Sequence, residues 1–306
     1  MIDIAIVGGG PAAYTAAIFA GRAGLNTIVY ESELIAGKIT SIPQIENYPG
    51  FPEGISGEEL SDRLHKQAEK FGVDTVYNEV KEIRLNGKYK EILIDSGETI
   101  KAKAVILAMG ETARKLGCPG EGKFLGKGVS YCAICDGAFF KGKNVAVIGG
   151  GDAALSSALY LCRLVKKLYL IHRRNDLRAI KILQDKLKQQ CEKGELVLNH
   201  EVKEIQGKKF VNGILVQNKE TEEVNRIDVD GVFIYIGSEP NTKIVREIVK
   251  VDEQGYIVTN EKMETSCPGI YAAGDVRKKD LRQLITAAAD GAIAAFQARR
   301  YIEMYY

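Results

Sequence analysis

The chain has 306 residues, which suggests about two domains, and 45% of them are apolar, enough to form buried cores. Its 42 basic and 40 acidic side chains are interspersed and leave a net charge of +2 at pH 7. Because so small a net charge creates no strong electrostatic field, we expect neither a nucleic-acid partner nor a membrane partner.

The N-terminus reads MIDIAIVGGG and lacks the basic, apolar and cleavage regions of a signal peptide. No apolar run approaches the ~18 residues that a membrane-spanning helix needs. We therefore expect a cytoplasmic protein, in which thiols stay reduced unless they are catalytic. We therefore predict four lone thiols: Cys118, Cys162, Cys191 and Cys267. Cys162 falls in an apolar helical stripe and is expected to lie in a core.

The first predicted strand ends in three glycines. The segment IDIAIVGGG precedes PAAYTAAIFAGRAG, and the apolar periodicity changes from strand to helix across the glycines, as a dinucleotide-binding turn requires. Gly8 allows the tight turn, Gly10 lets the backbone approach a pyrophosphate, and Ala13 lets the helix pack on the strand. The helix that starts at Pro11 and Ala12 then offers free N–H groups to the phosphates.

The next predicted strand, TIVYE, ends at Glu31, which lies 23 residues after Gly8. An acidic residue near this offset accepts hydrogen bonds from ribose hydroxyls, so the first turn suits the adenosine ribose of FAD or NAD. Farther along the chain, AVILAMG predicts a buried strand that ends at Gly110.

A second copy of this turn begins at residue 143, where KNVAVIGGG precedes DAALSSALYLCRLV. Its glycines are Gly149 and Gly151, and Ala154 takes the place of the small packing residue. One such turn is weak evidence for a nucleotide site, but the repetition in the same context favours two sites over ordinary glycine turns.

His172 stands in the second copy at the offset where the first copy has Glu31, and Arg173, Arg174 and Arg178 follow it. Guanidinium groups suit a ribose 2′-phosphate, which a carboxylate would repel. We therefore predict FAD at the first turn and NADPH at the second. The alternative for the arginines is a solvated charged stretch.

Near the C-terminus, GIYAAGDV predicts another apolar strand, which ends at Gly274 and Asp275 and precedes a long helical pattern. An aspartate at this point can bind a ribityl hydroxyl of FAD, although an ordinary strand and turn explains this motif equally well. Since the second nucleotide turn lies between the first and this segment, one domain is predicted to be inserted into the other.

The sequence thus predicts an α/β fold with two Rossmann-like dinucleotide-binding domains. The FAD-binding domain consists of residues 1–113 and 244–306, and the NADPH-binding domain of residues 114–243. The linking segments 109–123 and 235–242 are rich in glycine, proline and polar residues. Two connections at one junction suit a hinge.

One Cys-x-x-Cys pair, Cys132 and Cys135, lies in the inserted domain within SYCAICDGAFF. A zinc site would need a second pair of ligands, and the three histidines are dispersed along the sequence. We therefore expect no metal, and the short spacing favours a redox-active dithiol over a structural disulfide.

The chain resembles the low-molecular-weight thioredoxin reductases over nearly its whole length. The resemblance rests on GGGPAAYTAA, ENYPG, CAICDG, VAVIGGGDAA, HRRNDLR and AAGDV, with Arg282 and Gln283 after the last motif. It implies a homodimer that binds FAD and NADPH and reduces thioredoxin or a thioredoxin-like protein. It also implies that the inserted domain rotates between two orientations.

The resemblance further implies that electrons pass from NADPH through FAD to the Cys132–Cys135 disulfide. Cys135 would face the flavin, Cys132 would exchange with the target disulfide, and Asp136 would act as general acid and base. The FAD-binding residues would be Gly8, Gly10, Pro11, Ala12, Ala13, Glu31, Lys38, Ile39, Asn47, Gly110, Gly274, Asp275, Arg282 and Gln283. The NADPH-binding residues would be Gly149, Gly151, Asp152, Ala153, His172, Arg173, Arg174 and Arg178.

Two phenylalanines follow the cysteine pair, Phe139 and Phe140. They fit an apolar patch that grips the protein partner, as the resemblance implies, and they fit core packing equally well.

Three departures from the family pattern involve four positions. Lys38 replaces a glutamine near the flavin, Ser156 and Ser157 replace two glutamates, and Met109 replaces a threonine. These departures keep open an enzyme that takes electrons from ferredoxin or another carrier, although the intact HRRNDLR motif favours NADPH. A non-catalytic dinucleotide-binding redox sensor is a further alternative, which the retained cysteine pair and aspartate disfavour.

Overall fold

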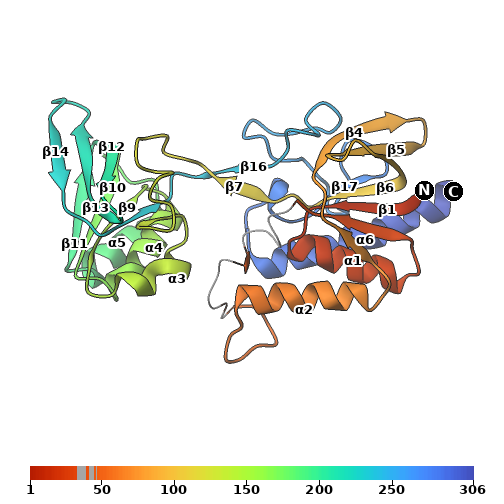
Figure 1. The fold of residues 1–306 in the computed structure, drawn as a ribbon, viewed down its shortest axis with the longest axis horizontal. Coiled ribbons are helices and arrows are strands. Elements are labelled where there is room, and N and C mark those ends of the chain that lie inside the picture. Colours follow the sequence, from red (N-terminus) through yellow and green to blue (C-terminus); the bar gives the residue numbers. More distant parts are fainter. Residues whose placement is uncertain (33–38, 41–44, 46) are drawn as a thin grey trace. The chain divides into compact units, whose positions relative to one another are not determined.

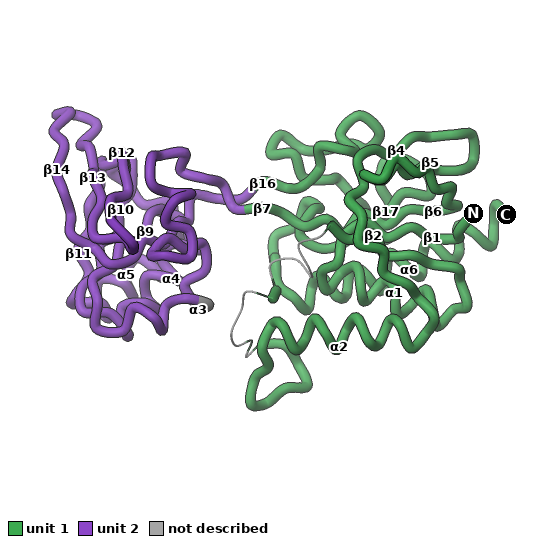
Figure 2. The backbone as a smooth tube through the Cα atoms, viewed as in Figure 1, with its two compact units in different colours: residues 1–112, 239–306 green, residues 113–238 purple. Residues whose placement is uncertain are grey.

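The computed structural model of the protein divides into two compact units (Figures 1 and 2). Unit 1 consists of Met1–Thr112 and Glu239–Tyr306, and unit 2 consists of Ala113–Ser238. The structure describes residues 1–32, 39–40, 45 and 47–306. Within these ranges no helix is both long and apolar enough to cross a membrane.

A seven-stranded sheet forms the centre of unit 1. Its order is β3-β2-β1-β6-β5-β4, and β17 pairs in parallel with β6. The strands are β1 (Ile2–Val7), β2 (Thr27–Tyr30), β3 (Asp74–Val76), β4 (Val80–Asn86), β5 (Tyr89–Ile94), β6 (Thr99–Leu107) and β17 (Ile270–Ala272). Because β17 aligns Ile270 with Val105, the C-terminal segment completes a sheet that the N-terminal segment begins.

Alternate side chains of β1 pack into two cores, one on each face of the sheet. Ile4 and Ile6 are fully buried under α1 (Pro11–Arg22), α2 (Gly57–Glu69) and α6 (Leu284–Tyr305), which lie on one side of the sheet (Figure 1). Ala5 and Val7 point into the core on the other side. A strand covered on both faces is the expected partner of parallel neighbours, and each buried isoleucine contributes about 1.5–3 kcal/mol to stability.

The long helix α6 packs closely against α1. A Cβ atom on Gly291 would lie 3.0 Å from the carbonyl carbon of Ala12 and 3.1 Å from the backbone nitrogen of Ala16. Only a residue without a side chain therefore permits this approach. The contact brings the start of α6 towards the glycine turn between β1 and α1.

A buried ionic cluster centred on Asp290 connects α6 to the segment that follows β17. The carboxylate of Asp290, 5% exposed, accepts hydrogen bonds from Arg277 (2.8 and 3.0 Å), from Lys279 (3.0 Å) and from the backbone N–H of Gly274 (3.0 Å). Burial alone would raise the pKa of Asp290, but the bonds from Arg277 and Lys279 outweigh it and lower the pKa.

Unit 2 has a five-stranded parallel sheet of order β11-β10-β9-β15-β8 and a separate antiparallel sheet of order β12-β13-β14. The first sheet contains β8 (Val129–Ser130), β9 (Asn144–Ile148), β10 (Lys167–His172), β11 (Gly194–Leu198) and β15 (Gly231–Ile234). The second contains β12 (His200–Gly207), β13 (Val211–Asn218) and β14 (Val224–Ile227). The helices are α3 (Ala133–Asp136), η2 (Gly137–Phe140), α4 (Asp152–Cys162) and α5 (Lys181–Gln190). Parallel sheets with helices in both units confirm the α/β prediction.

The chain passes between the units twice, and the two passages pair with each other. Strands β7 (Glu111–Ala113) and β16 (Ser238–Pro240) form a two-stranded sheet. Next to it, the side chain of Asn241 donates a hydrogen bond to the Met109 carbonyl at 2.9 Å.

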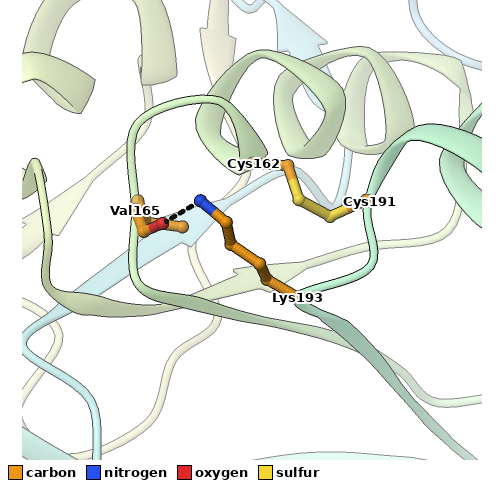
Figure 3. Close-up of a disulfide and its surroundings, with 4 residues drawn as sticks. All are labelled: Cys162, Val165, Cys191 and Lys193. Carbon is orange, nitrogen blue, oxygen red and sulfur yellow. Dashed lines mark hydrogen bonds between the residues drawn. A yellow bond between two sulfur atoms is a disulfide. The ribbon is translucent and has the colours of Figure 1, made fainter.

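Unit 2 contains a disulfide that the sequence did not predict. Cys162 and Cys191 are bonded to each other, with their Cα atoms 5.8 Å apart, so the prediction of lone thiols is wrong for both (Figure 3). Cys118 and Cys267 are free, as predicted. Both cysteines lie in the core of unit 2, where Cys162 is 6% and Cys191 5% exposed.

The disulfide forms because α4 and α5 end side by side on the same face of the sheet. Cys162 is the last residue of α4, and Cys191 caps the C-terminus of α5. Close by, Lys193 donates a hydrogen bond to the Val165 carbonyl at 3.1 Å (Figure 3). The two cysteines are 29 residues apart in the sequence, and nothing in that spacing indicates that they meet. The prediction of lone thiols followed from the expected reducing compartment and did not consider two cysteines buried side by side.

Replacing Cys162 and Cys191 by alanine together should lower the free energy of unfolding of unit 2 by about 2–4 kcal/mol, since the bond closes a loop of the unfolded chain. Denaturant unfolding with a probe in unit 2 measures this. The double variant Cys118→Ala with Cys267→Ala is the matched control and should change stability much less. Equal effects of the two double variants would contradict the assignment of a stabilising bond.

Replacing Asp290 by asparagine should cost about 3–5 kcal/mol at neutral pH, because Arg277 and Lys279 lose their buried counter-charge. Since the pKa of Asp290 is lowered on folding, its contribution is present above the unfolded pKa near 4 and is lost as the pH falls further. The variant should therefore lose part of the acid dependence of stability.

Unfolding titrations between pH 7 and pH 3 test this prediction. The control is Asp62→Asn, which breaks an exposed 2.8 Å pair with Lys66 and should cost less than about 1 kcal/mol. An Asp290→Asn protein as stable as the parent at pH 7 would show that the cluster does not hold α6.

Candidate functional site

The first glycine turn is shaped by close contacts with the backbone. Gly8 has a φ of 113°, and its N–H donates to the carbonyl of Tyr30 at 2.8 Å. A Cβ atom on Gly8 would lie 2.7 Å from the carbonyl carbon of Ala108. At Gly10, by contrast, a Cβ atom would meet no described atom within 4 Å. The turn is therefore packed on its inner side and open where the helix α1 begins.

Glu31 lies directly behind this turn. It is 3% exposed, and its carboxylate occupies the space that a side chain on Gly9 would need. The hydroxyl of Tyr14 in α1 donates to it at 3.0 Å. Burial, and to a smaller degree the charge of Glu31, raise the pKa of Tyr14, which keeps the phenol protonated as a donor.

The GDV turn of η3 (Gly274–Val276) adjoins the same place from the other end of the chain. Gly274 has a φ of 79°, and a Cβ atom on it would lie 3.0 Å from the Cβ atom of Ala12. The predicted FAD-binding residues Gly10, Ala12, Gly274 and Asp275 are thus brought together although more than 260 residues separate them in the sequence.

Other predicted FAD-binding residues occupy the segment before α6. Asn47 donates to the side chain of Gln283 at 3.0 Å, and Gln283 caps α6. The guanidinium of Arg282 lies 4.2 Å from the centre of the Tyr256 ring and 3.6 Å from Glu111, so it already has partners within unit 1. Ile39 is buried in the core, Gly110 has a φ of 62°, and Lys38 lies outside the described residues.

The second glycine turn repeats the first in detail. Gly149 has a φ of 145°, and its N–H donates to the carbonyl of Ile171 at 2.9 Å. A Cβ atom on Gly150 would lie 2.6 Å from the ring of His172, and one on Gly151 would meet no described atom within 4 Å. His172, 5% exposed, therefore stands behind the second turn as Glu31 stands behind the first.

The segment after His172 folds back over the second turn. The backbone N–H groups of Arg178 and Ala179 donate to the Gly150 carbonyl at 2.7 and 3.0 Å. The carboxylate of Asp152 accepts a bond from the backbone N–H of Ile180 at 2.8 Å. Asp152 thus has a structural task in shaping this segment, in addition to the nucleotide contact predicted for it.

These bonds hold a cluster of positive charge near the start of α4. Arg173, Arg174 and Arg178 are exposed, as is Ala153 in the first turn of the helix. Burial, and then the charges of the arginines led by Arg178, lower the pKa of His172. The region has the exposed guanidinium groups and open backbone that an anionic ligand requires.

The predicted redox segment adjoins α4 in the same unit. Cys132 is disulfide-bonded, while the side chain of Cys135 lies outside the described part of the chain. Cys132 accepts a backbone hydrogen bond from Asp136 at 3.1 Å, which closes the short helix α3. A Cβ atom on Gly137 would lie 2.9 Å from side-chain atoms of both Tyr160 and Leu161, so the segment packs closely on α4.

The two phenylalanines after the cysteine pair have different environments. Phe140 is 8% exposed and packs edge-on against Phe233 at 5.3 Å between ring centres, so core packing is correct for it and the partner patch is not. Phe139 is 73% exposed, and Ile134 in α3 is 54% exposed. Both are exposed apolar side chains of the redox segment.

Sequence reasoning missed Asp290 and Tyr235. Asp290 is the single charged residue within LITAAADGAIAAF, and a charge in so apolar a helical segment is a signal of burial with a partner. The phenol of Tyr235 accepts a hydrogen bond from the backbone of Ala133 at 2.6 Å, and nothing in the sequence indicates this contact. No group of three metal-ligating side chains is found among the described residues.

Comparison with known proteins identifies the family. The model of the pyridine nucleotide-disulphide oxidoreductases matches residues 2–291. A thioredoxin reductase of Listeria innocua is 45% identical over 303 residues, which cover 98% of this chain and 94% of that protein.

Two solved structures are also similar. A thioredoxin reductase of Lactococcus lactis matches with a TM-score of 0.83 and 40% identity, covering 99% of this chain and 100% of that one. A ferredoxin-flavin thioredoxin reductase of Clostridium acetobutylicum matches with a TM-score of 0.54 and 35% identity, covering 99% and 98%. The chain therefore belongs to the pyridine nucleotide-disulphide oxidoreductase family, and within it to the low-molecular-weight thioredoxin reductases.

Proposed function

We propose that the protein uses NADPH, through bound FAD, to reduce the disulfide of thioredoxin or a thioredoxin-like protein. The observation that carries this proposal is the disulfide-bonded Cys132, held beside Asp136 on an exposed apolar segment of the unit that also bears the second glycine turn. The overall reaction balances as NADPH, one proton and a disulfide giving NADP⁺ and a dithiol.

The first glycine turn, which lies in unit 1, fits FAD. Gly10 leaves room for a pyrophosphate at the start of α1, and the buried carboxylate of Glu31 is an acceptor for ribose hydroxyls. Gly274 and Asp275 stand next to the same turn, where Asp275 suits the ribityl chain. When bound, FAD supplies a carrier that accepts a hydride and passes on an electron pair.

The second glycine turn, which lies in unit 2, fits NADPH. Gly151 is open towards the start of α4, and the backbone bonds to Gly150 keep the arginine segment over the turn. Arg173, Arg174 and Arg178 offer the forked donors that a 2′-phosphate needs, and His172 replaces the carboxylate that would repel it.

At the redox segment, Cys132 is the residue we assign to exchange with the partner disulfide, and Cys135 is its resolving partner. Asp136 would hold and return the proton of the leaving thiolate. Ile134 and Phe139 offer the apolar contact surface for the protein partner.

A dithiol cannot serve a buried cofactor and a bulky protein partner in one position. We propose that unit 2 turns about the paired strands β7 and β16, through which the chain passes between the units.

We also propose a cytoplasmic homodimer without nucleic-acid or membrane partners. The nearly neutral net charge supports the absence of a polyanionic partner. Exposed apolar side chains on α1 and α6, Phe19, Ile293 and Phe296, supply a face suited to a second copy of the chain.

A second candidate takes electrons from ferredoxin or another carrier in place of NADPH. The similarity to the Clostridium acetobutylicum protein and the serines at 156 and 157 favour it. The arginine cluster favours NADPH, because a reductase that does not bind NADPH has no use for it.

Replacing Cys132 or Cys135 by serine should reduce the turnover of a thioredoxin disulfide to the uncatalysed background while NADPH still bleaches the flavin. A coupled assay with thioredoxin and a separate anaerobic stopped-flow measurement separate the two steps. Cys118→Ser, which alters a free cysteine of the same unit, is the control and should retain turnover. Full turnover by either first variant would exclude the dithiol mechanism.

Replacing Arg173 and Arg174 by alanine should raise the KM for NADPH by at least about 10- to 100-fold and leave the KM for NADH nearly unchanged, because even one charged hydrogen bond contributes about 1.5–3 kcal/mol. Steady-state kinetics with both nucleotides measure this. Arg163→Ala removes an exposed arginine at the other end of α4 and should alter neither value. An equal loss with NADH would mean that the arginines do not contact a 2′-phosphate.

A further inference from the structure

The redox segment is held by hydroxyl groups that lie outside the predicted site. The backbone N–H of Cys132 donates to the hydroxyl of Ser130 at 2.9 Å, and the N–H of Ala133 donates to the phenol of Tyr235 at 2.6 Å. Ala133 is fully buried, so its amide has no access to water as a substitute acceptor. The phenol of Tyr235 therefore determines where the backbone beside Cys132 lies.

Tyr235 is itself fixed by the second glycine turn. Its N–H donates to the carbonyl of Ile148 at 2.7 Å, at the end of β9. Its carbonyl carbon lies 3.0 Å from the position of a Cβ atom on Gly149, so the backbone of Tyr235 is pressed against the turn. A shift of the phenol would need a shift of the strand end that forms the nucleotide site.

The internal repeat indicates that a turn of this kind forms without a tyrosine. In unit 1 the equivalent residue is Ala108, whose N–H donates to Val7 at 2.8 Å and whose carbonyl is pressed against Gly8 in the same way. Alanine at this position therefore satisfies the turn. The tyrosine of unit 2 adds a hydroxyl that reaches the redox segment.

Ser157 supports the phenol from α4. The Ser157 hydroxyl lies near the phenol, where its interaction opposes the rise in the pKa of Tyr235. Burial raises the pKa of Tyr235, with a smaller contribution from the charge of Asp136, against the opposing bonds with Ser157 and Ala133. The phenol thus stays protonated and can accept one bond while donating another.

We propose that Tyr235 and Ser157 are positioning residues of the redox couple, which set its reduction potential by fixing the backbone between Cys132 and Asp136. The inference rests on the proposed function only in taking Cys132 and Cys135 as the redox couple. Tyr235 acts through the backbone, because its phenol is bonded to the amide of Ala133, the residue after Cys132.

The expected effect follows from the closeness of the two thiols in the reduced protein. Without the phenol, the buried Ala133 amide loses its acceptor and the segment is less well ordered. The two thiols are then close together for a smaller fraction of the time, so the disulfide forms less readily. The equilibrium between disulfide and dithiol shifts towards the dithiol.

The test is the reduction potential of the Cys132–Cys135 couple in the full-length Tyr235→Phe protein, equilibrated with glutathione or dithiothreitol buffers. Alkylation and mass spectrometry of the peptide give the reduced fraction without any need for turnover. The disulfide should become about threefold to tenfold easier to reduce, and a tenfold change corresponds to about 30 mV. Ser157→Ala should shift the equilibrium in the same direction by a smaller factor.

Tyr160→Phe is the matched control. Tyr160 packs its ring on Gly137 beside the same segment, and no hydrogen bond of its hydroxyl is found in the described part of the chain. It should leave the potential unchanged. Parent-like potentials in both Tyr235→Phe and Ser157→Ala would overturn the proposal, as would an equal shift in Tyr160→Phe.

The outcome is independent of the proposed electron donor. If NADPH failed to reduce the parent disulfide, the proposed function would fall, while the thiol-buffer equilibrium would still decide the role of Tyr235. If Tyr235→Phe did not fold, Ser157→Ala would decide the question alone, and a parent-like potential for it would count against the proposal.

Discussion

The architecture depends on one steric constraint, which occurs once in each unit. A glycine just after the first strand must lack a side chain because a residue at the C-terminal end of the neighbouring strand, or directly after it, fills that space. Gly9 meets the carboxylate of Glu31, and Gly150 meets the ring of His172. This contact fixes the conformation of the turn and leaves the next glycine, Gly10 or Gly151, open towards the start of a helix. It also places the side chain of Glu31 or His172 directly behind the turn.

The same constraint accounts for the difference between the units. The side chain behind the turn is an acid in unit 1 and a histidine, followed by three exposed arginines, in unit 2. On this difference rests the proposal that the two turns bind different nucleotides. The residue directly after the other flanking strand differs between the units, Ala108 after β6 in unit 1 and Tyr235 after β15 in unit 2. Through that residue the second nucleotide turn is joined to the redox segment.

Features set by local spacing could be predicted from the sequence. The positions of Glu31 and His172 follow from a fixed strand–turn–helix–strand length, and the strand and helix types follow from periodicity. Contacts between distant segments could not. The Cys162–Cys191 bond depends on where two helices end, and the Ala133–Tyr235 bond joins residues 102 apart. Phe140 was ambiguous because an apolar residue after a redox pair fits both a core and a surface.

The central claim is that NADPH and FAD, held at the two glycine turns, would pass electrons to the disulfide of Cys132 and not to the Cys162–Cys191 disulfide. An anaerobic titration of the FAD-loaded protein with NADPH, followed by alkylation and mass spectrometry of all six cysteines, tests it most directly. The account predicts uptake of about two equivalents, one for the flavin and one for the disulfide, with Cys132 and Cys135 newly alkylated and Cys162 and Cys191 still paired. A fully reduced flavin with Cys132 still in its disulfide would contradict it.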